Sequence, residues 1–326
     1  MTAGPEEIAH AIAHLRAGGL VAFPTETVYG LGAPAFDAEA VARVFERKGR
    51  PPANPVIVHV SGEEMARRAV ASWPEEARVL AREFWPGPLT IVLPRSAEVP
   101  PIVTGGGPNV GVRCPEHALT LALLEAFGAP LVGPSANISG SVSPTRAEHV
   151  RESFPGDEVY VLDGGACRAG IESTVVTLAE TPARVLRPGV IGAAALGAAL
   201  GVPVTPAGTE VTPPGAGPLP APGLLALHYA PARPARLVGR VELEALLRSP
   251  RPRLAVVTHE PIDVPRPHEL IALSSEAGAY AAGLYAALRA ADAQVPDLIA
   301  ILRPPLGPGA VWEAVHDRLA RATARA

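Results

Sequence analysis

Lysine is nearly absent from this chain of 326 residues: Lys48 is the only lysine among 28 basic side chains. Because arginine fills every other basic position, the retained lysine indicates a site that needs a compact ammonium charge, which a planar guanidinium does not reproduce. Together with Arg50, Lys48 would bind a phosphate or a carboxylate. The alternative is a cation at a helix C-terminus, favoured by the helix dipole and by Gly49 as a C-terminal cap.

Cysteine and long apolar runs are also scarce, and each scarcity excludes a class of protein. Two cysteines, Cys114 and Cys167, are too few for a disulfide framework, and neither belongs to a zinc-binding pattern. No apolar stretch is long enough to span a bilayer, and no charged start precedes an apolar run. The net charge of −4 gives no general reason to expect tight binding to nucleic acid. We therefore expect a soluble, cytoplasmic protein without membrane contact, whose thiols are buried and reduced.

The standard nucleotide-binding loops are missing. A Walker loop requires Gly-Lys-Ser or Gly-Lys-Thr, whereas the lysine here is followed by Gly49 and Arg50. Ser135 does not lie in the GxSxG elbow of hydrolases. His10 and His14 are four residues apart and could face a metal, but an exposed pair on a first helix explains them better. Any nucleotide must therefore be bound by other groups, and we expect no metal site made by the protein.

The sequence does contain an alternation of short β-type runs with helical patterns. Helices fit between several of the runs, including one capped by Asp37 and one introduced by Pro115. This pattern predicts an α/β fold with an open, twisted, mixed sheet. Before residue 203, strands are predicted at residues 19–23, 55–60, 89–93, 110–113, 130–133, 158–162 and 173–178.

A proline-rich segment divides the chain. Residues 203–234 contain nine prolines, so they cannot form a helix or a central strand. We interpret them as a linker or lid between a domain of residues 1–202 and one of residues 235–326. In the later part strands alternate with helices, which predicts a small parallel α/β domain. A segment that served only as a spacer would rarely contain the aromatic side chains of His228 and Tyr229.

Polar side chains near the ends of the predicted strands define a candidate ligand cleft. Open α/β sheets bind ligands at strand ends, and hydroxyls, amides and cations suit a base, a ribose or a phosphate. Each residue alone also has a structural explanation: a lone histidine is often a satisfied core residue, and serines cap helices. The set comprises Thr25, Thr27, Arg50, Asn54, His59, Arg113, Ser135, Asn137, Ser139, Ser143, Ser173, Thr174 and Arg187.

Four motifs, in order and spacing, resemble the YrdC-like threonylcarbamoyl-AMP synthases over about the first 190 residues. The motifs are residues 24–32 (PTETVYGLG), the run from Lys48 to His59 with Asn54, residues 84–90 (FWPGPLT) and residues 134–140 (PSANISG). Later, residues 228–231 (HYAP) and 312–319 (WEAVHDRL) resemble the two-domain (Sua/YwlC) form of this family. The resemblance implies a YrdC-like catalytic domain, a Rossmann-like C-terminal domain and a linker that folds over the active site.

The resemblance also implies an activity, in which L-threonine, bicarbonate or CO2, and ATP give L-threonylcarbamoyladenylate and pyrophosphate. The product would pass to a tRNA threonylcarbamoyl transferase, and a weak contact with tRNA belongs to the same expectation. Such chemistry can consist of positioning and charge stabilisation. Mg²⁺ is expected on the ATP phosphates and not in a protein cage, because no carboxylate cluster is evident.

The same resemblance assigns roles to individual residues. Lys48 and Arg50 would act on the phosphates and the developing carbamate as the catalytic pair. Threonine would contact Thr27, His59, Arg113, Gly133 and Ser173. Besides the catalytic pair, ATP would contact Asn54, Asn109, Ser135, Asn137, Ser143, Arg187 and Tyr229. Asn109 stands where the family often has threonine, and the linker lacks the lysines common before its His-Tyr motif.

Two other functions are open alternatives. An RNA-binding or regulatory module with a YrdC-like fold would bind RNA in a salt-dependent way without turning over ATP. The acidic balance and the 4% of aromatic residues argue against it. A carbamoyl-adenylate enzyme of hydrogenase maturation would bring an acylphosphatase segment and zinc-spaced cysteines, and the sequence has neither.

Overall fold

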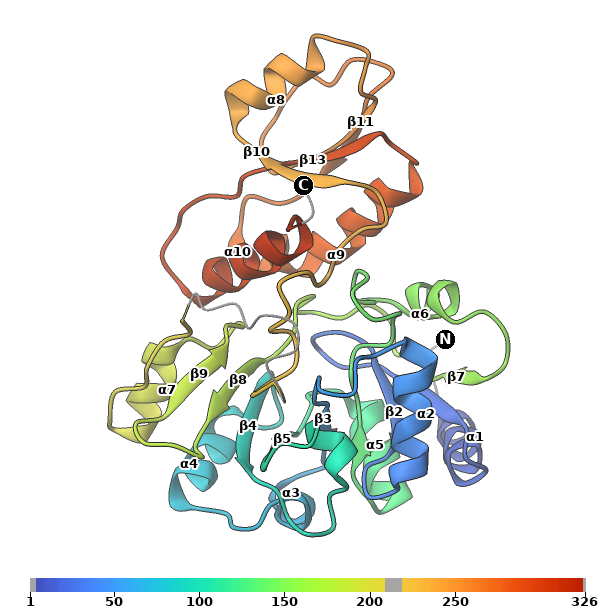
Figure 1. Cartoon of the computed structure of the whole chain (residues 1–326), viewed down its shortest axis with the longest axis vertical. Helices are drawn as coiled ribbons and strands as arrows, with labels where there is room; N and C mark the ends of the chain where they lie inside the picture. The colour runs from blue at the N-terminus through green and yellow to red at the C-terminus, as the bar shows by residue number, and fades with distance from the viewer. Residues whose placement is uncertain (1–3, 209–218, 325–326) are drawn as a thin grey trace.

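The computed structural model describes residues 4–208 and 219–324. The chain forms two α/β units, one around a nine-stranded sheet and one around a four-stranded sheet (Figure 1). The predicted fold class, a mixed sheet followed by a small parallel one, is confirmed. Within the described ranges, no helix combines the length and the apolar character needed to cross a bilayer.

The large sheet has the strand order β7-β1-β2-β6-β3-β5-β4-β8-β9 and mixes both directions. The pairs β1·β7, β3·β5 and β4·β8 are parallel, and the other neighbours are antiparallel. Its register places His59 directly beside Arg113. The strands are β1 (Leu20–Phe23), β2 (Gly30–Pro34), β3 (Ile57–His59), β4 (Leu89–Pro94), β5 (Asn109–Arg113), β6 (Leu131–Val132), β7 (Val159–Val161), β8 (Thr174–Thr177) and β9 (Arg184–Arg187).

Seven α-helices accompany the large sheet in the described residues and cover its two faces unequally. Side chains of β1 alternate between faces: Ala22 joins the main core with α2, whereas Phe23 joins a separate core with α1 and α5. The helices are α1 (Pro5–Arg16), α2 (Ala38–Lys48), α3 (Glu63–Ala69), α4 (Glu75–Phe84), α5 (Ala118–Phe127), α6 (Ala147–Ser153) and α7 (Ala193–Leu200).

The face that carries Phe23 is completed by the linker and not by another helix. Val92 of β4 and Val175 of β8 pack there against Ala221 and Leu224 of the linker. Helices α1 and α5 cover the β1 and β6 side of the same face. The middle of this face, over β3 and β5, is therefore left for polar side chains.

The glycines of the 24–32 motif have a packing role that the sequence does not indicate. The motif reads as a turn in which glycines let a ligand approach, but β2 begins at Gly30. A Cβ atom on Gly30 would lie 2.8 Å from the ring of Phe23, and one on Gly32 would lie 2.9 Å from it. The two glycines make room for this ring, and their weak β-propensity hides the strand from sequence analysis.

Helix α2 begins and ends where the sequence predicts. The side chain of Asp37 accepts hydrogen bonds from the backbone N–H groups of Glu39 and Ala40. Gly49 adopts a left-handed conformation with φ of 59° and ends the helix. Lys48 is thus the last helical residue, and its position is fixed by the cap that follows it.

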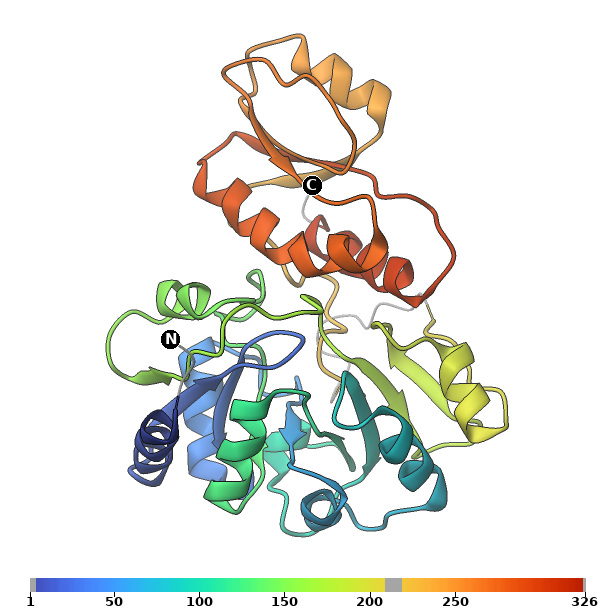
Figure 2. The ribbon, with the colours of Figure 1, turned by 180° about the vertical axis from the view of Figure 1, so that it is seen from behind.

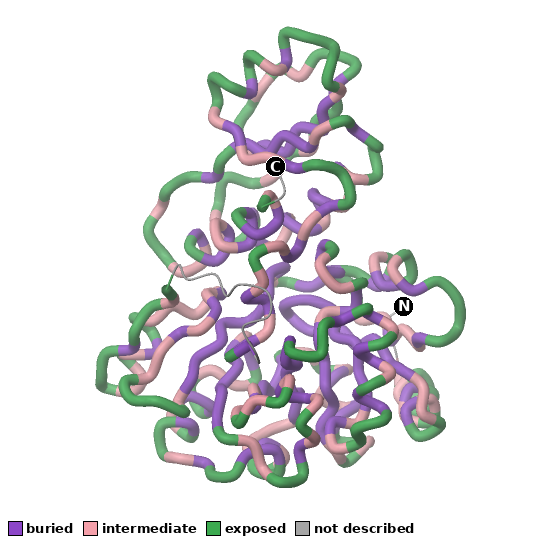
Figure 3. The backbone as a smooth tube through the Cα atoms, viewed as in Figure 1, coloured by how far each residue is buried: buried purple, intermediate pink, exposed green. Residues whose placement is uncertain are grey.

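The second unit is a parallel sheet with helices on both faces. Helix α8 packs on the face away from the first unit, and α9 and α10 pack on the face toward it (Figure 2). Their core includes Val28, Val142 and Ile171 of the first unit, and buried residues continue across the junction (Figure 3). The strands lie in the order β10-β13-β11-β12. The elements are β10 (Ala235–Val238), α8 (Arg240–Leu247), β11 (Leu254–Thr258), β12 (Glu269–Ala272), α9 (Ala277–Ala293), β13 (Leu298–Leu302) and α10 (Ala310–Ala322).

Candidate active site

A small polar cavity lies on the large sheet beneath the linker. Its volume of about 40 Å³ holds only a few water molecules. Pro222, Gly223, His228 and Tyr229 of the linker contribute to its wall. The other lining residues are Thr25, Thr27, Val28, Gly30, Arg50, Ile57, His59, Arg113, Gly133, Pro134, Ser135, Glu172 and Arg187.

Lys48 lies behind the cavity wall, almost completely buried. Its ammonium donates hydrogen bonds to the carbonyl oxygens of Ser135 and Asn137, both at 2.5 Å. Burial, and then the neighbouring charge of Arg50, lowers the pKa of Lys48 well below its usual value. Lys48 does lie at the C-terminus of a helix, as the alternative interpretation of the sequence predicts. That position alone does not explain why its ammonium is buried with only neutral carbonyl oxygens as partners.

Arg50 and Arg187 are two further buried cations at the cavity. The guanidinium of Arg50 donates to Oδ1 of Asn54 at 2.8 Å and to the carbonyl oxygen of Pro55 at 2.6 Å. The guanidinium of Arg187 donates to the carbonyl oxygen of Ser173 at 2.9 Å and to that of Pro222 at 3.1 Å. Burial lowers the pKa of both groups. In the described ranges neither cation pairs with a carboxylate, so the cavity carries uncompensated positive charge.

Two buried carboxylates, Glu172 in the cavity wall and Glu26 behind Arg113, each pair with a different arginine. Glu26 forms a buried ion pair with Arg113, at 2.7 Å between carboxylate and guanidinium. Glu172 pairs with Arg318 of helix α10 at 2.8 Å. Burial opposes ionisation of Glu172, but Arg318, Arg187 and the hydroxyl of Ser143 outweigh it and hold its pKa at about 2. Glu172 is therefore ionised at neutral pH, and among the described residues neither carboxylate forms an ion pair with Lys48, Arg50 or Arg187.

Three polar atoms at the cavity have no partner among the residues that the structure describes. They are Nδ1 of His59, Nδ1 of His228 and the hydroxyl of Tyr229. Burial lowers the pKa of His59 well below its usual value and that of His228 to about 3, so both imidazoles are neutral. Buried polar groups are rarely left without a partner. These atoms are therefore available to a polar ligand as hydrogen-bonding groups and not as charges.

Gly133 has no room for a side chain. A Cβ atom at this position would lie 2.6 Å from Nδ1 of His59 and 2.6 Å from the ring of Phe23. Its backbone N–H donates to the carbonyl oxygen of Ile57 at 2.9 Å. The glycine thus allows the strand end to pass close to His59 and keeps that imidazole beside the cavity.

The structure brings most of the predicted site residues together. Asn109, Ser139 and Thr174 are exceptions that do not line the cavity; Asn109 begins β5, whose other end carries Arg113. Nine predicted residues line the cavity: Thr25, Thr27, Arg50, His59, Arg113, Gly133, Ser135, Arg187 and Tyr229. Five others support these residues or Glu172 through hydrogen bonds: Lys48, Asn54, Asn137, Ser143 and Ser173. Their roles toward a ligand stay predictions.

Sequence analysis missed Glu26 and Glu172 and the second-domain residues that contact Glu172. Glu172 immediately precedes the predicted Ser173, which was the one local signal. Its partner Arg318 is 146 residues away, and no spacing rule joins such a pair. Glu26 pairs with Arg113 within the first unit, whereas the role of Glu172 and of its second-domain partners depends on the docking of the two units.

Fold and site together define a two-domain α/β protein with a cation-lined cavity under its linker. A family model described as Telomere recombination (Sua5_yciO_yrdC) matches residues 13–189. A second model, described as the C-terminal domain of threonylcarbamoyl-AMP synthase, matches residues 191–324. The chain belongs to the threonylcarbamoyl-AMP synthase family, in the two-domain form that its motifs indicate. The predicted domain boundaries at residues 203 and 235 stay predictions.

Curated relatives and a solved structure agree with this placement. The threonylcarbamoyl-AMP synthase of Bacillus subtilis is 37% identical over 335 residues, which cover 97% of this chain and 92% of that protein. That of Pyrococcus abyssi is 48% identical over 221 residues, and this match spans 64% of its length, slightly less than two thirds. The crystal structure of P. abyssi Sua5 complexed with L-threonine superposes with a TM-score of 0.88 at 39% identity, covering 97% of this chain and 94% of that one.

Proposed function

We propose that this protein condenses L-threonine, bicarbonate or CO2, and ATP into L-threonylcarbamoyladenylate and pyrophosphate. One observation carries the proposal: Lys48, Arg50 and Arg187 are buried cations whose described hydrogen-bond partners are all neutral. A triphosphate supplies the negative charge that these cations lack. The named activity of the relatives supports the same reaction.

The three cations would bind the triphosphate of ATP and stabilise the charge that develops on it. Phosphoryl and nucleotidyl transfer depend mainly on positioning and on fixed positive charge. Asn54 orients Arg50 through its side-chain oxygen, and the carbonyl oxygens of Ser135 and Asn137 hold the ammonium of Lys48. Hydrogen bonds hold these side chains in place before the ligand arrives, so little reorganisation of their positions is needed at the moment of reaction.

Threonine would lie between Arg113 and His59. Arg113 uses one nitrogen for Glu26 and another for the carbonyl oxygen of Gly87, so its fork retains donors for the threonine carboxylate. Neutral His59 offers Nδ1 to a polar group of the amino acid. The P. abyssi structure complexed with L-threonine supports a threonine site in this fold.

The reaction balances without a protein nucleophile. The amine of threonine attacks the carbon of CO2, or of bicarbonate with loss of water, and gives up a proton; the surrounding cations lower the pKa of that amine. An oxygen of the resulting carbamate attacks the α-phosphorus of ATP. The bond from that phosphorus to the bridging oxygen breaks, and pyrophosphate leaves with its charge stabilised by the buried cations.

Entry of these substrates requires the linker to move. Pockets for ligands of this size usually measure about 300–1,000 Å³. The cavity measures about 40 Å³ with His228 and Tyr229 in its wall. The described conformation is therefore a closed one, whose cavity is too small to hold ATP and threonine.

Magnesium would arrive with the phosphates. No three His, Cys, Asp or Glu side chains are placed to hold a metal within residues 4–208 and 219–324. The carboxylates of Glu26 and Glu172 are already paired with arginines. This donor set fits Mg²⁺ coordinated mainly by phosphate oxygens, which would shield the charge of the triphosphate.

The product is a mixed carbamic–phosphoric anhydride, and its reactivity implies a consuming enzyme. A transferase that moves the threonylcarbamoyl group onto tRNA fits this chemistry. We propose this partner, a weak contact with tRNA and a cytoplasmic location on the strength of family membership. The carbamoyl-adenylate alternative has no support in the family models that match.

The test is pyrophosphate release from ATP with threonine and bicarbonate each present or omitted. We expect release only with both, and a loss of about 100-fold or more in Lys48→Met, the scale of removing one fixed transition-state charge. Arg47→Met, which removes a cation of the same helix that pairs with Glu158, is the matched control and should stay within about twofold. ATP binding without release under any combination would favour the regulatory or RNA-binding alternative.

A further inference from the structure

Glu172 places a negative charge in a cavity that is otherwise suited to anions. It lies just before β8 and lines the cavity together with Arg50 and Arg187. Arg187 and Glu172 interact electrostatically, although no hydrogen bond joins them. A carboxylate free to move here would compete with phosphate for the same guanidinium groups.

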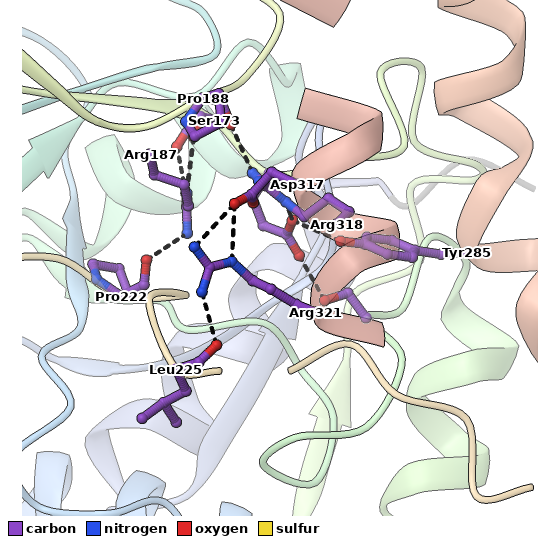
Figure 4. A network of polar contacts seen from close by, with 11 residues as sticks. Ser173, Arg187, Pro188, Pro222, Leu225, Tyr285, Asp317, Arg318 and Arg321 are labelled. Carbon is purple, nitrogen blue, oxygen red and sulfur yellow. Dashed lines mark hydrogen bonds and ion pairs between the residues drawn. The ribbon is translucent and has the colours of Figure 1, made fainter. Parts of the chain in front are cut away.

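The second domain neutralises this carboxylate. Nε of Arg318 and the hydroxyl of Tyr285 both donate to Oε2 of Glu172 at 2.8 Å, and the hydroxyl of Ser143 donates to Oε1 at 2.7 Å. Arg318 is fully buried, and Asp317 contacts its guanidinium at 2.5 Å. Figure 4 shows Arg318 of α10 and Tyr285 of α9 meeting in the same network of polar contacts.

The same arginine contacts the linker. Its guanidinium lies over the ring of Tyr229 at 5.3 Å, and Tyr285 stacks on that ring with centroids 5.6 Å apart. Tyr229 has a positive φ of 61°, which is uncommon for a tyrosine and is maintained by its packing. Arg318 therefore contacts both the carboxylate of the cavity and the residue that closes it.

We infer that Arg318 is a positioning residue for ATP binding: its ion pair holds the Glu172 carboxylate away from the cavity cations and leaves them free for the triphosphate. This inference rests on the proposed function. It gives the second domain a defined part in the reaction, because the domain controls the charge of a site to which it contributes no lining residue.

Arg318→Met tests the inference, because it removes the charge and keeps an apolar side chain of similar length. Glu172 then loses its ion pair, and the nearest cations are those of the cavity. We expect the dissociation constant for ATP to rise about tenfold, with kcat changing less than KM for ATP. Calorimetric titration with Mg·ATP measures the affinity, and thermal unfolding checks that the variant is folded.

The rescue by a second substitution separates charge from packing. In Arg318→Met/Glu172→Gln no carboxylate remains to compete, so ATP affinity should return to within about twofold of wild type. Arg289→Met is the matched control. Arg289 also joins the second domain to the first, through the carbonyl oxygen of Val142 at 2.6 Å, but it does not contact Glu172. The Arg289→Met variant should bind ATP with the affinity of the wild type.

Two results would overturn the inference. The first is unchanged ATP affinity in Arg318→Met. The second is weakened affinity that Glu172→Gln fails to restore, which would mean that Arg318 acts through docking of the domains. If Arg318→Met does not fold, Arg318→Gln removes the same charge, retains a donor for the carbonyl oxygen of Pro188, and carries the same test.

The readout distinguishes failure of the inference from failure of the proposed function. ATP binding needs neither threonine nor turnover, so the affinity series is complete even if pyrophosphate release is absent. Wild-type protein that releases pyrophosphate while Arg318→Met binds ATP normally contradicts the inference alone. Wild-type protein that does not bind ATP contradicts the proposed function itself.

Discussion

The ammonium of Lys48 lies 2.5 Å from the carbonyl oxygen of Ser135, with a second carbonyl and no described carboxylate beside it. Because burial penalises the charged form, the pKa of Lys48 is well below its usual value. A phosphate at this position would favour the ammonium and raise that pKa. Ligand binding and protonation of Lys48 are therefore coupled.

The coupling predicts that ATP binding takes up protons. Between the lowered pKa of free Lys48 and the raised pKa of the complex, the complex holds more protons, so apparent ATP affinity falls as pH rises through this window. The measurement is calorimetry above about pH 8, where the phosphates are fully ionised, in two buffers of different ionisation enthalpy. Buffer-independent heats in wild type would contradict the prediction. Lys48→Met should show no uptake.

Gly133→Ala should weaken both folding and threonine binding. The added Cβ atom of the alanine would lie 2.6 Å from Nδ1 of His59, so the imidazole or the strand must shift. Overpacking of this kind costs about 1–3 kcal/mol in the free energy of unfolding. Gly239→Ala is the control, since nothing lies within 4 Å of its added Cβ. Denaturant unfolding and KM for threonine are measured for both, and equal behaviour would show that the close approach is not required.

Acid should remove the stabilisation that Glu172 provides. Its pKa is about 2 in the folded protein against 4.5 as the reference value, so its stabilisation is present above pH 4.5 and is lost as the pH falls toward 2. The shift corresponds to on the order of 3 kcal/mol. The difference in unfolding free energy between wild type and Glu172→Gln should shrink over this range in urea titrations. A constant difference would mean that the ion pair does not set this pKa.

Tyr229→Phe should separate stability from activity. Its hydroxyl has no partner among the described residues, so removing it should change the free energy of unfolding by less than about 1 kcal/mol, while the ring still stacks on Tyr285. If the hydroxyl binds substrate in the closed state, pyrophosphate release falls about tenfold. Tyr160→Phe on the outer strand β7 is the control. Full activity in Tyr229→Phe would exclude the hydroxyl from substrate binding.

Local signals in the sequence predicted the local parts of this structure. Asp37 and Gly49 gave the two ends of α2, and the β-branched runs gave most strands, because caps and alternation depend on neighbouring residues. Strand β2 was not predicted, since its glycines serve the ring of Phe23, which only the fold brings near. The sequence indicates the cavity cations through the single lysine at position 48 and through arginines near the ends of predicted strands. The ion pair of Glu172 with Arg318 was not, because it depends on how two domains dock.

The burial of Lys48 also provides a natural probe for movement of the linker away from the cavity. Apart from the terminal amine, the chain has a single amine for acylating reagents, and its side chain is almost completely inaccessible in the closed form. Opening would expose this amine to solvent and so to the reagent. The rate of covalent labelling at this one position would then follow the motion of the linker in unmodified, full-length protein.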